Sequence, residues 1–229
     1  MPPVALVVPV IDEAAAIGAV VRAVPRVWVA SVIVVVGGSR DDTVAVAREA
    51  GAEVVVEGRR GYGRACLTGV EAAAARGAEV VAFMDGDGSD RPEHLPDLLR
   101  PILDGAADFT IGSRARGDRE RGSMGAHQLW AGRAIGFGVR VLYGVGYTDM
   151  CALRAIRMDV LRGLGMREMT YGWNLEMQMR VARARWRVLE VPVAHRRRRG
   201  GESKVSGTVR GTLRAGSRIL ATMARVALE

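Results

Sequence analysis

The chain has 229 residues, 49% hydrophobic and 25% charged, so it can bury a core as one large domain or two small ones and is not a disordered chain. Two cysteines are too few for a disulfide framework, and no apolar run reaches the ~18–20 residues that cross a bilayer. A secretory signal is not recognisable at the N-terminus, which favours a cytoplasmic protein.

The positive charge is concentrated at the C-terminal end. The net charge is +8, and residues 195–229 hold nine basic residues against two acidic ones, so the preceding chain is close to neutral. This distribution favours an anionic partner near the C-terminus. The tail lacks the interleaved aromatic residues that stack on bases, so an RNA-binding function is disfavoured and we expect no nucleic-acid partner.

The first half of the chain alternates between short apolar runs and longer amphipathic segments. The β-branched apolar runs predict buried strands at 4–9, 31–36, 52–56, 79–84 and 108–111. Start and stop signals predict helices between them, at 12–24, 41–50, 62–76 and 91–103. Strands that alternate with helices through short connections predict an α/β fold with a mostly parallel central sheet and helices on both faces.

The regular alternation stops near Gly112. The second half predicts loops at 114–125 and 196–207, strands at 148–156 and 188–193, and helices at 128–142, 174–185 and 208–228. We expect one domain over residues 1–207, in which the half 113–207 completes a site begun by the half 1–112. Residues 208–229 are expected to form a separate basic amphipathic helix.

Two carboxylates follow directly after the strand predicted at 79–84. Ligands of parallel sheets bind outside the carboxyl ends of the strands, where Asp85 and Asp87 can share a hard divalent cation. Gly86 between them lets a diphosphate approach the backbone. The competing interpretation is a polar turn with Asp90 as the N-cap of the next helix, but the position after a buried strand favours the cation site.

Other chemistries have weaker support in the sequence. Gly61-Tyr62-Gly63 opens a helix like a dinucleotide-binding loop, but Cys66 replaces the third glycine and the segment follows the third strand instead of the first. The sequence contains no Walker loop, no Gly-x-Ser-x-Gly elbow and no cysteine or histidine spacing typical of zinc ligands.

The ordered motifs resemble those of inverting family 2 glycosyltransferases with the GT-A fold, and by motif most of all the polyprenyl-phosphate mannosyl- and glucosyltransferases. The resemblance covers about the first 207 residues and begins with the segments Val8–Glu13, Val34–Thr43, Gly61–Ala65 and Asp85–Asp87. It continues through Gly112–Arg114, Gly132-Arg133, Thr148-Asp149, Trp173–Glu176 and Gly200–Lys204.

The resemblance implies transfer of a hexose from a UDP- or GDP-sugar, with Mg²⁺ or Mn²⁺ held by Asp85 and Asp87. It implies catalytic contributions from Asp87, Arg133 and Glu176. It also implies nucleotide-sugar contacts by Pro9, Ile11, Glu13, Val36, Ser39, Arg64, Asp85, Gly86, Arg114, Arg199, Ser203 and Lys204. A metal and cationic side chains suit this reaction because the leaving nucleoside diphosphate gains negative charge.

One position departs from the family pattern. The family usually has an acidic residue at the end of the second strand, which contacts the base or ribose, and this chain has Val36 followed by Gly37. Valine accepts no hydrogen bond, so donor identity and affinity depend on compensation, for instance by Asp41 or Asp42. Asp12 stands where the family commonly has Asn.

Glu176 has two interpretations. In members that act on hydroxyl acceptors the equivalent helix carries the catalytic base, whereas a lipid phosphate is already anionic and needs none. Glu176 would then pair with Arg180, one helical turn away. Tyr171 and Trp173 likewise fit either stacking on a sugar or packing in the core.

The last predicted helix has a basic face, on which Arg210, Arg214 and Arg218 recur every fourth residue. Its opposite, apolar face predicts either contact with the inner face of an anionic membrane or packing on this domain or a second copy. The resemblance implies polyprenyl phosphate as the acceptor, and a helix at the membrane would suit it. Transfer to a small hydroxylated metabolite and a non-catalytic sugar-nucleotide binder are the alternatives.

Overall fold

The computed structural model describes the backbone of residues 1–200 and 209–229 and, in the second range, the side chains from Ala215 onward. Its strands are β1 (Val4–Val10), β2 (Ser31–Val36), β3 (Glu53–Val56), β4 (Val80–Phe83), β5 (Phe109–Ser113), β6 (Arg154–Arg157) and β7 (Val188–Pro192). They form one seven-stranded sheet in the order β3-β2-β1-β4-β6-β5-β7. Only β6 runs antiparallel to its neighbours, so the prediction of a mostly parallel α/β sheet is confirmed.

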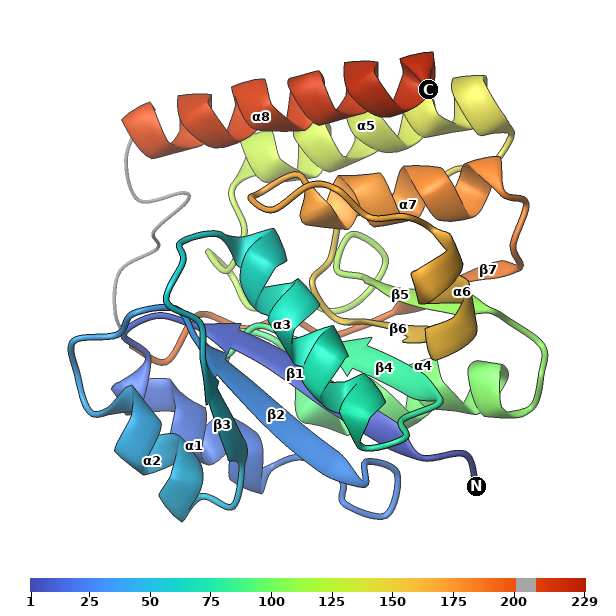
Figure 1. Cartoon of the computed structure of the whole chain (residues 1–229). Coiled ribbons are helices and arrows are strands. Elements are labelled where there is room, and N and C mark those ends of the chain that lie inside the picture. Colours follow the sequence, from blue (N-terminus) through green and yellow to red (C-terminus); the bar gives the residue numbers. More distant parts are fainter. Residues whose placement is uncertain (201–208) are drawn as a thin grey trace.

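The helices surround this sheet (Figure 1). They are α1 (Ala14–Arg22), α2 (Thr43–Glu49), α3 (Tyr62–Ala75), the short 3₁₀ helix η1 (Pro92–His94), α4 (Leu95–Leu103), α5 (Ala126–Tyr143), α6 (Met158–Gly163), α7 (Trp173–Arg183) and α8 (Val209–Leu228). Figure 1 shows α3 across one face of β1 and β2, with α1 and α2 on the other. Both cysteines are free and buried, as expected for a chain without a disulfide framework.

The second half differs from the prediction at residues 148–163. The strand predicted at 148–156 is reduced to β6, because the Asp149 carboxylate accepts the backbone N–H groups of Arg114 and Met150 and turns the chain before the strand begins. The helix α6 follows β6 directly and was not predicted. Its six residues are too few to show a helical period.

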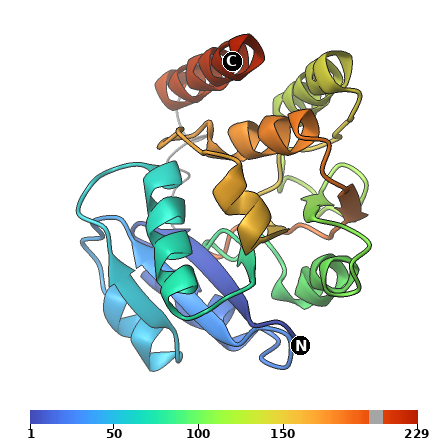
Figure 2. The ribbon, with the colours of Figure 1, turned by 45° about the vertical axis from the view of Figure 1, so that its right-hand side comes forward.

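The C-terminal helix packs on its own domain. Ala215 and Val226 are buried, and Ile219 and Met223 are half-buried against the core. Figure 2 shows α8 beside α5 at one end of the molecule, with α7 beneath them. Part of the apolar face predicted for this helix, Ile219, Met223 and Val226, is therefore packed within the chain, whereas Leu220 is 65% exposed. In the part of the chain that the structure describes, no helix is both long and apolar enough to cross a membrane.

Asp108 joins the three strands at one edge of the sheet. At the start of β5, its carboxylate accepts the backbone N–H of Arg187 (3.0 Å) and two guanidinium N–H groups of the same residue, which precedes β7. Arg157, at the end of β6, donates a further hydrogen bond of 3.3 Å. The hydrogen bonds from Arg187 lower the pKa of Asp108 to about 2.

This low pKa predicts an acid-dependent loss of stability. Because the folded pKa lies below the unfolded value of about 3.9, ionised Asp108 stabilises the fold above pH 4, and the contribution is lost as the pH falls through about 2. We expect Asp108→Asn to lower the free energy of unfolding at pH 7 by about 1–3 kcal/mol. In urea titrations the difference from wild type should shrink below pH 4, whereas the exposed control Asp104→Asn should show little difference at any pH. A pH-independent difference for Asp108→Asn would contradict this assignment.

Candidate active site

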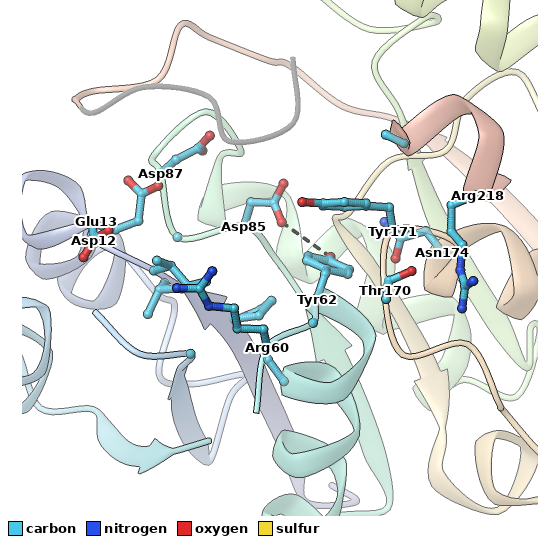
Figure 3. A pocket seen from close by; sticks show the side chains of 18 of the residues that line it. Asp12, Glu13, Arg60, Tyr62, Asp85, Asp87, Thr170, Tyr171, Asn174 and Arg218 are labelled. Carbon is cyan, nitrogen blue, oxygen red and sulfur yellow. Dashed lines mark hydrogen bonds between the residues drawn. The ribbon is translucent and has the colours of Figure 1, made fainter. Parts of the chain in front are cut away.

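A cleft of about 1140 Å³ lies at the carboxyl ends of the parallel strands. One wall is built by the loops that follow β1, β2 and β4, and the other by the start of α5, residues 170–175 and the first half of α8. Figure 3 shows Asp12, Glu13 and Asp87 on the first wall, with Thr170, Tyr171, Asn174 and Arg218 on the second. The site predicted from the order of strands is therefore a real cavity that both halves of the chain enclose.

Hydrogen bonds tie the loop after β1 to the loop after β2. Asp12 donates its backbone N–H to the Ser39 hydroxyl (2.8 Å) and accepts the backbone N–H of Arg40 on its carboxylate (2.7 Å). Its φ of +49° lies in the left-handed region, which Asp and Asn tolerate better than most residues, so Asp can stand where Asn is common. Ser39, for which a donor contact was predicted, does not line the cleft, and its hydroxyl accepts the hydrogen bond from the Asp12 backbone.

The first wall of the cleft contains the predicted residues Pro9 and Ile11 but not Val36. Val36 is only 2% exposed and points into the core, and the wall beside it is made by Gly37 and Gly38. A Cβ on Gly37 would lie 3.2 Å from Ile11 Cγ1. Gly37 and Gly38, which have no side chains, therefore shape this end of the cleft. The side chain of Val36 does not line it, contrary to the predicted donor contact.

Neither proposed substitute for the missing carboxylate reaches the cleft. Asp41 accepts the backbone N–H of Ala14 (3.1 Å) and is bonded to Thr43, so it fixes the starts of α1 and α2. Asp42 is the exposed residue before α2. The acidic residues nearest to Val36 in sequence that do line the cleft are Asp12 and Glu13.

Asp85 and Asp87 both lie in the cleft, on the turn that follows β4. Burial raises the pKa of Asp85 to about 8, and the neighbouring Asp90 and Asp87 raise it in the same direction. The hydroxyl of Tyr62 donates to Asp85 Oδ1 (3.4 Å), which Figure 3 shows as a dashed line. Gly86 packs its backbone against Val10 and leaves no room for a side chain.

This pair of carboxylates fits a divalent cation. Within residues 1–200 and 209–229 no group of three or more His, Cys, Asp or Glu side chains is arranged to hold a metal ion. Mg²⁺ commonly binds one or two carboxylates and completes its coordination with substrate phosphates and water. The crowding of negative charge around Asp85 would be relieved by such a cation.

The segment 195–200 closes over the turn of Asp85 and Asp87. Arg199 donates its backbone N–H to the Asp87 carbonyl (3.0 Å), and its side chain packs against Gly88 outside the cleft. Arg198 is the residue that lines the cleft, with its guanidinium 2.5 Å from Glu13 and 3.8 Å from Asp87. Arg198, and not the predicted Arg199, therefore lines this part of the cleft. Ser203 and Lys204 lie outside the described residues.

Arg114 lies in the cleft and is held rigidly. Its Nε and Nη2 donate to the two carboxylate oxygens of Asp149 (2.7 and 2.8 Å). Such a two-point pair fixes the plane of the guanidinium. Arg114 is therefore a pre-oriented cation beside the acidic turn, at a position that the sequence predicts for phosphate contact.

The two halves of the chain touch where α3 begins. A Cβ on Gly61 or Gly63 would overlap the backbone of residues 168–169, so glycine is required for this close approach. Arg64, for which a donor contact was predicted, follows this crossing and does not line the cleft. Arg60, just before the glycines, lines it instead (Figure 3).

Glu176 is not placed to act as a catalytic base. Its side chain is fully buried and is absent from the cleft wall. It accepts the backbone N–H groups of Arg167 (2.9 Å) and Glu168 (2.6 Å) and pairs with Arg180 and Arg225, each at 3.0 Å. The structural interpretation, a pair with Arg180, is confirmed, and Glu176 also anchors α8 through Arg225.

Arg133 is likewise displaced from its predicted role. It lies on the exposed side of α5, where its guanidinium stacks over Trp130 at 5.8 Å from the ring centroid, and it does not line the cleft. Of the two aromatic residues weighed for sugar stacking, Trp173 is buried in the core and Tyr171 lines the cleft.

The sequence did not predict several of the cleft residues. They are polar or cationic side chains to which the sequence assigned no role in the site: Arg40 and Asn174, inside motif segments, and Arg60, Thr170 and Arg218, outside them. Arg60 precedes a recognised glycine pair, so its position carried a usable signal. Arg218 belonged to the basic tail, where its charge suggested a surface and not a cleft.

The parallel sheet, the acidic turn at its carboxyl edge and the cleft around that turn define a glycosyltransferase with the GT-A fold. A family model described as "Glycosyl transferase family 2" matches residues 5–165, and the chain belongs to this family. The resemblance seen in the motifs is thereby confirmed, and the protein is an enzyme of the glycosyltransferase class.

Two relatives extend the match over most of the chain. An uncharacterised glycosyltransferase of Mycobacterium tuberculosis is 38% identical over 214 residues, which are 92% of this chain and 93% of the relative. The polyprenol monophosphomannose synthase of Mycolicibacterium smegmatis is 33% identical over 203 residues, 84% of this chain and 75% of that protein.

A solved structure shares the fold. The glucosyl-3-phosphoglycerate synthase of Mycobacterium tuberculosis, crystallised with Mn²⁺, UDP and phosphoglyceric acid, superposes with a TM-score of 0.79. It is 21% identical, and the match covers 99% of this chain and 78% of that one. At this level of identity the similarity concerns the fold alone.

The position of Glu176 leads to a prediction about stability. Glu176→Gln removes the charge that faces two arginines. We expect the free energy of unfolding of this variant to be about 3 kcal/mol lower than that of wild type. The exposed control Glu49→Gln should change it by less than about 0.5 kcal/mol. Urea denaturation at pH 7 measures both. A Glu176→Gln protein that unfolds like wild type but has lost turnover would restore the catalytic interpretation.

Proposed function

We propose that this enzyme transfers a hexose, with inversion, from a nucleoside diphosphate sugar to a polyprenyl phosphate. The observation that carries the proposal is the chemistry of the second wall of the cleft. Its described side chains include Arg218, which pairs with Glu168, and the polar groups of Gln128, Thr170, Tyr171 and Asn174, but no carboxylate or histidine; Arg114, which pairs with Asp149, lies in the same cleft. A wall of this kind suits an anionic acceptor.

An acceptor phosphate needs cations to bind and no base to react. A hydroxyl acceptor must lose a proton as it attacks, and a side chain within reach must accept it. Glu176, the expected base, is buried away from the cleft. A phosphate monoester is already negatively charged at neutral pH, so the second wall supplies what it requires.

The first wall supports binding of the donor. Asp85 and Asp87 would hold Mg²⁺ or Mn²⁺, whose charge stabilises the departing diphosphate. Arg198, between Glu13 and Asp87, brings a guanidinium to the same place. Pro9, Ile11 and the backbone of Gly37 and Gly38 shape the space for the nucleoside, with Asp12 as a polar contact.

The reaction then requires no proton transfer by the protein. An oxygen of the acceptor phosphate attacks C1 of the sugar, and the bond from C1 to the donor diphosphate breaks. The electron pair of that bond leaves with the nucleoside diphosphate. Attack opposite the leaving group inverts the configuration at C1, and Arg114 and Arg198 would stabilise charge on the phosphates.

One observation supports a second candidate. The fold neighbour from Mycobacterium tuberculosis was crystallised with phosphoglyceric acid, a small hydroxylated metabolite. By contrast, the relative from Mycolicibacterium smegmatis is named for a polyprenol product and is 33% identical in sequence over 84% of this chain. We therefore favour the lipid phosphate and use phosphoglycerate as the competing acceptor. A non-catalytic sugar-nucleotide binder is the third outcome.

The donor site is tested first by calorimetric titration with UDP-glucose, GDP-mannose, UDP and GDP, each with and without Mn²⁺. We expect metal-dependent binding of one nucleotide and a loss of at least tenfold in affinity in Asp85→Ala/Asp87→Ala. The exposed control Asp104→Ala should bind like wild type. If no nucleotide binds under any condition, the proposed transferase function is wrong.

The acceptor is tested by mass spectrometry of the products formed from the bound donor with either a short-chain polyprenyl phosphate or phosphoglycerate. We expect transfer to the lipid phosphate. Arg218→Gln should raise the KM for that acceptor about tenfold, because a charge-assisted hydrogen bond is lost, and should leave donor affinity unchanged. The control Arg162→Gln, on α6, lies outside the cleft. Transfer to phosphoglycerate alone would favour the second candidate, and donor binding without transfer the third.

A further inference from the structure

The helix α5 presents an apolar face to solvent. Trp130 is 69% exposed, Phe137 68% and Val141 68%. These residues stand at positions i, i+7 and i+11, with the exposed Ala134 between them, and therefore share one side of the helix. A continuous apolar strip of this kind on a folded protein marks a surface that contacts a partner.

This face cannot turn inward without breaking the packing beneath it. On the opposite side of α5, Gly136 lies so close to the Tyr147 carbonyl that a Cβ would overlap it. Gly132 faces the backbone of Thr148 and Asp149 at ordinary contact distance. The glycines fix the rotation of the helix, so the apolar residues are held outward by the fold.

The charge on this helix is of one sign. Arg133 and Arg140 are exposed beside the apolar strip, and Arg133 stacks on Trp130. Residues 126–143 contain no Asp or Glu. Tryptophan at the boundary between apolar and polar groups, together with arginines, is typical of helices that lie in the headgroup region of an anionic bilayer.

We propose that the exposed face of α5, defined by Trp130, Arg133, Phe137, Arg140 and Val141, docks the enzyme on an anionic lipid bilayer. A second copy is a less suitable occupant. A twofold interface through this face would bring arginines together without a carboxylate from α5 to pair with them. The docking surface thus differs from the apolar face of α8 that the sequence suggested, of which Ile219, Met223 and Val226 pack on the domain.

The position of α5 connects this surface to the cleft. Gln128, in the first turn of α5, lines the cleft, and Trp130 lies two residues further on, about 3 Å along the helix axis. On the other side, α8 contributes Ile219 to the cleft and leaves Leu220 65% exposed. This connection rests on the proposed function, because a phosphate carried at the bilayer surface would meet the cleft beside the docked helix.

Vesicle flotation of the full chain tests the docking surface without turnover. The vesicles contain phosphatidylcholine alone or with a quarter phosphatidylglycerol. We expect wild type to bind the anionic vesicles and Trp130→Ser/Phe137→Ser to bind them at least tenfold less. At low salt, Arg133→Gln/Arg140→Gln should also bind them less than wild type does. The matched control Val27→Ser/Trp186→Ser removes exposed apolar groups elsewhere and should bind like wild type. Circular dichroism melts confirm that each variant is folded.

Three results would overturn the proposal: no binding of wild type to anionic vesicles, equal binding of Trp130→Ser/Phe137→Ser, or a dimer in sedimentation experiments that this variant abolishes. A transfer assay separates this failure from that of the proposed function. If wild type floats with vesicles but modifies no lipid phosphate, the proposed docking surface is supported and the proposed function is wrong. If Trp130→Ser/Phe137→Ser loses vesicle binding but still modifies a short, water-soluble polyprenyl phosphate, both the docking surface and the proposed function are supported.

Discussion

The close crossing of two backbone segments holds the cleft together. Residues 168–169 pass directly over Gly61 and Gly63, where any side chain would collide. Since the first segment belongs to the late part of the chain and the second to the early part, this contact brings the two walls to a fixed separation. Beside this crossing, the Glu176 carboxylate accepts the backbone N–H groups of residues 167 and 168, and Glu168 and Glu176 anchor α8 through Arg218 and Arg225.

The two walls differ in electrostatic character. The donor side concentrates carboxylates that crowd one another, whereas the described acceptor side offers cations and neutral polar groups. The proposed reaction joins two phosphorylated molecules and would need both: a cation attracted to the leaving diphosphate, and an attacking anion that binds without repulsion from an opposing carboxylate.

The sequence predicted the parallel part of the fold because its strands are short, apolar and bounded by clear signals. It also predicted the acidic turn, because a carboxylate pair directly after a buried parallel strand lies at the edge of the sheet where ligands bind. It failed for side chains whose direction depends on tertiary packing. Val36 and Gly37 are adjacent, and only the twist of β2 decides which of them faces the cleft. Glu176 matched a motif position, but two arginines and two backbone N–H groups enclose it.

The attachment of α8 has a consequence for how such proteins diverge. Two buried carboxylates, Glu168 and Glu176, hold this helix through Arg218 and Arg225, and the same helix supplies part of the cleft wall. Because α8 has both roles, it cannot be exchanged between relatives or removed by truncation. Its loss would expose two carboxylates and open the cleft to water. In this chain, the last helix and the catalytic domain must evolve as one unit.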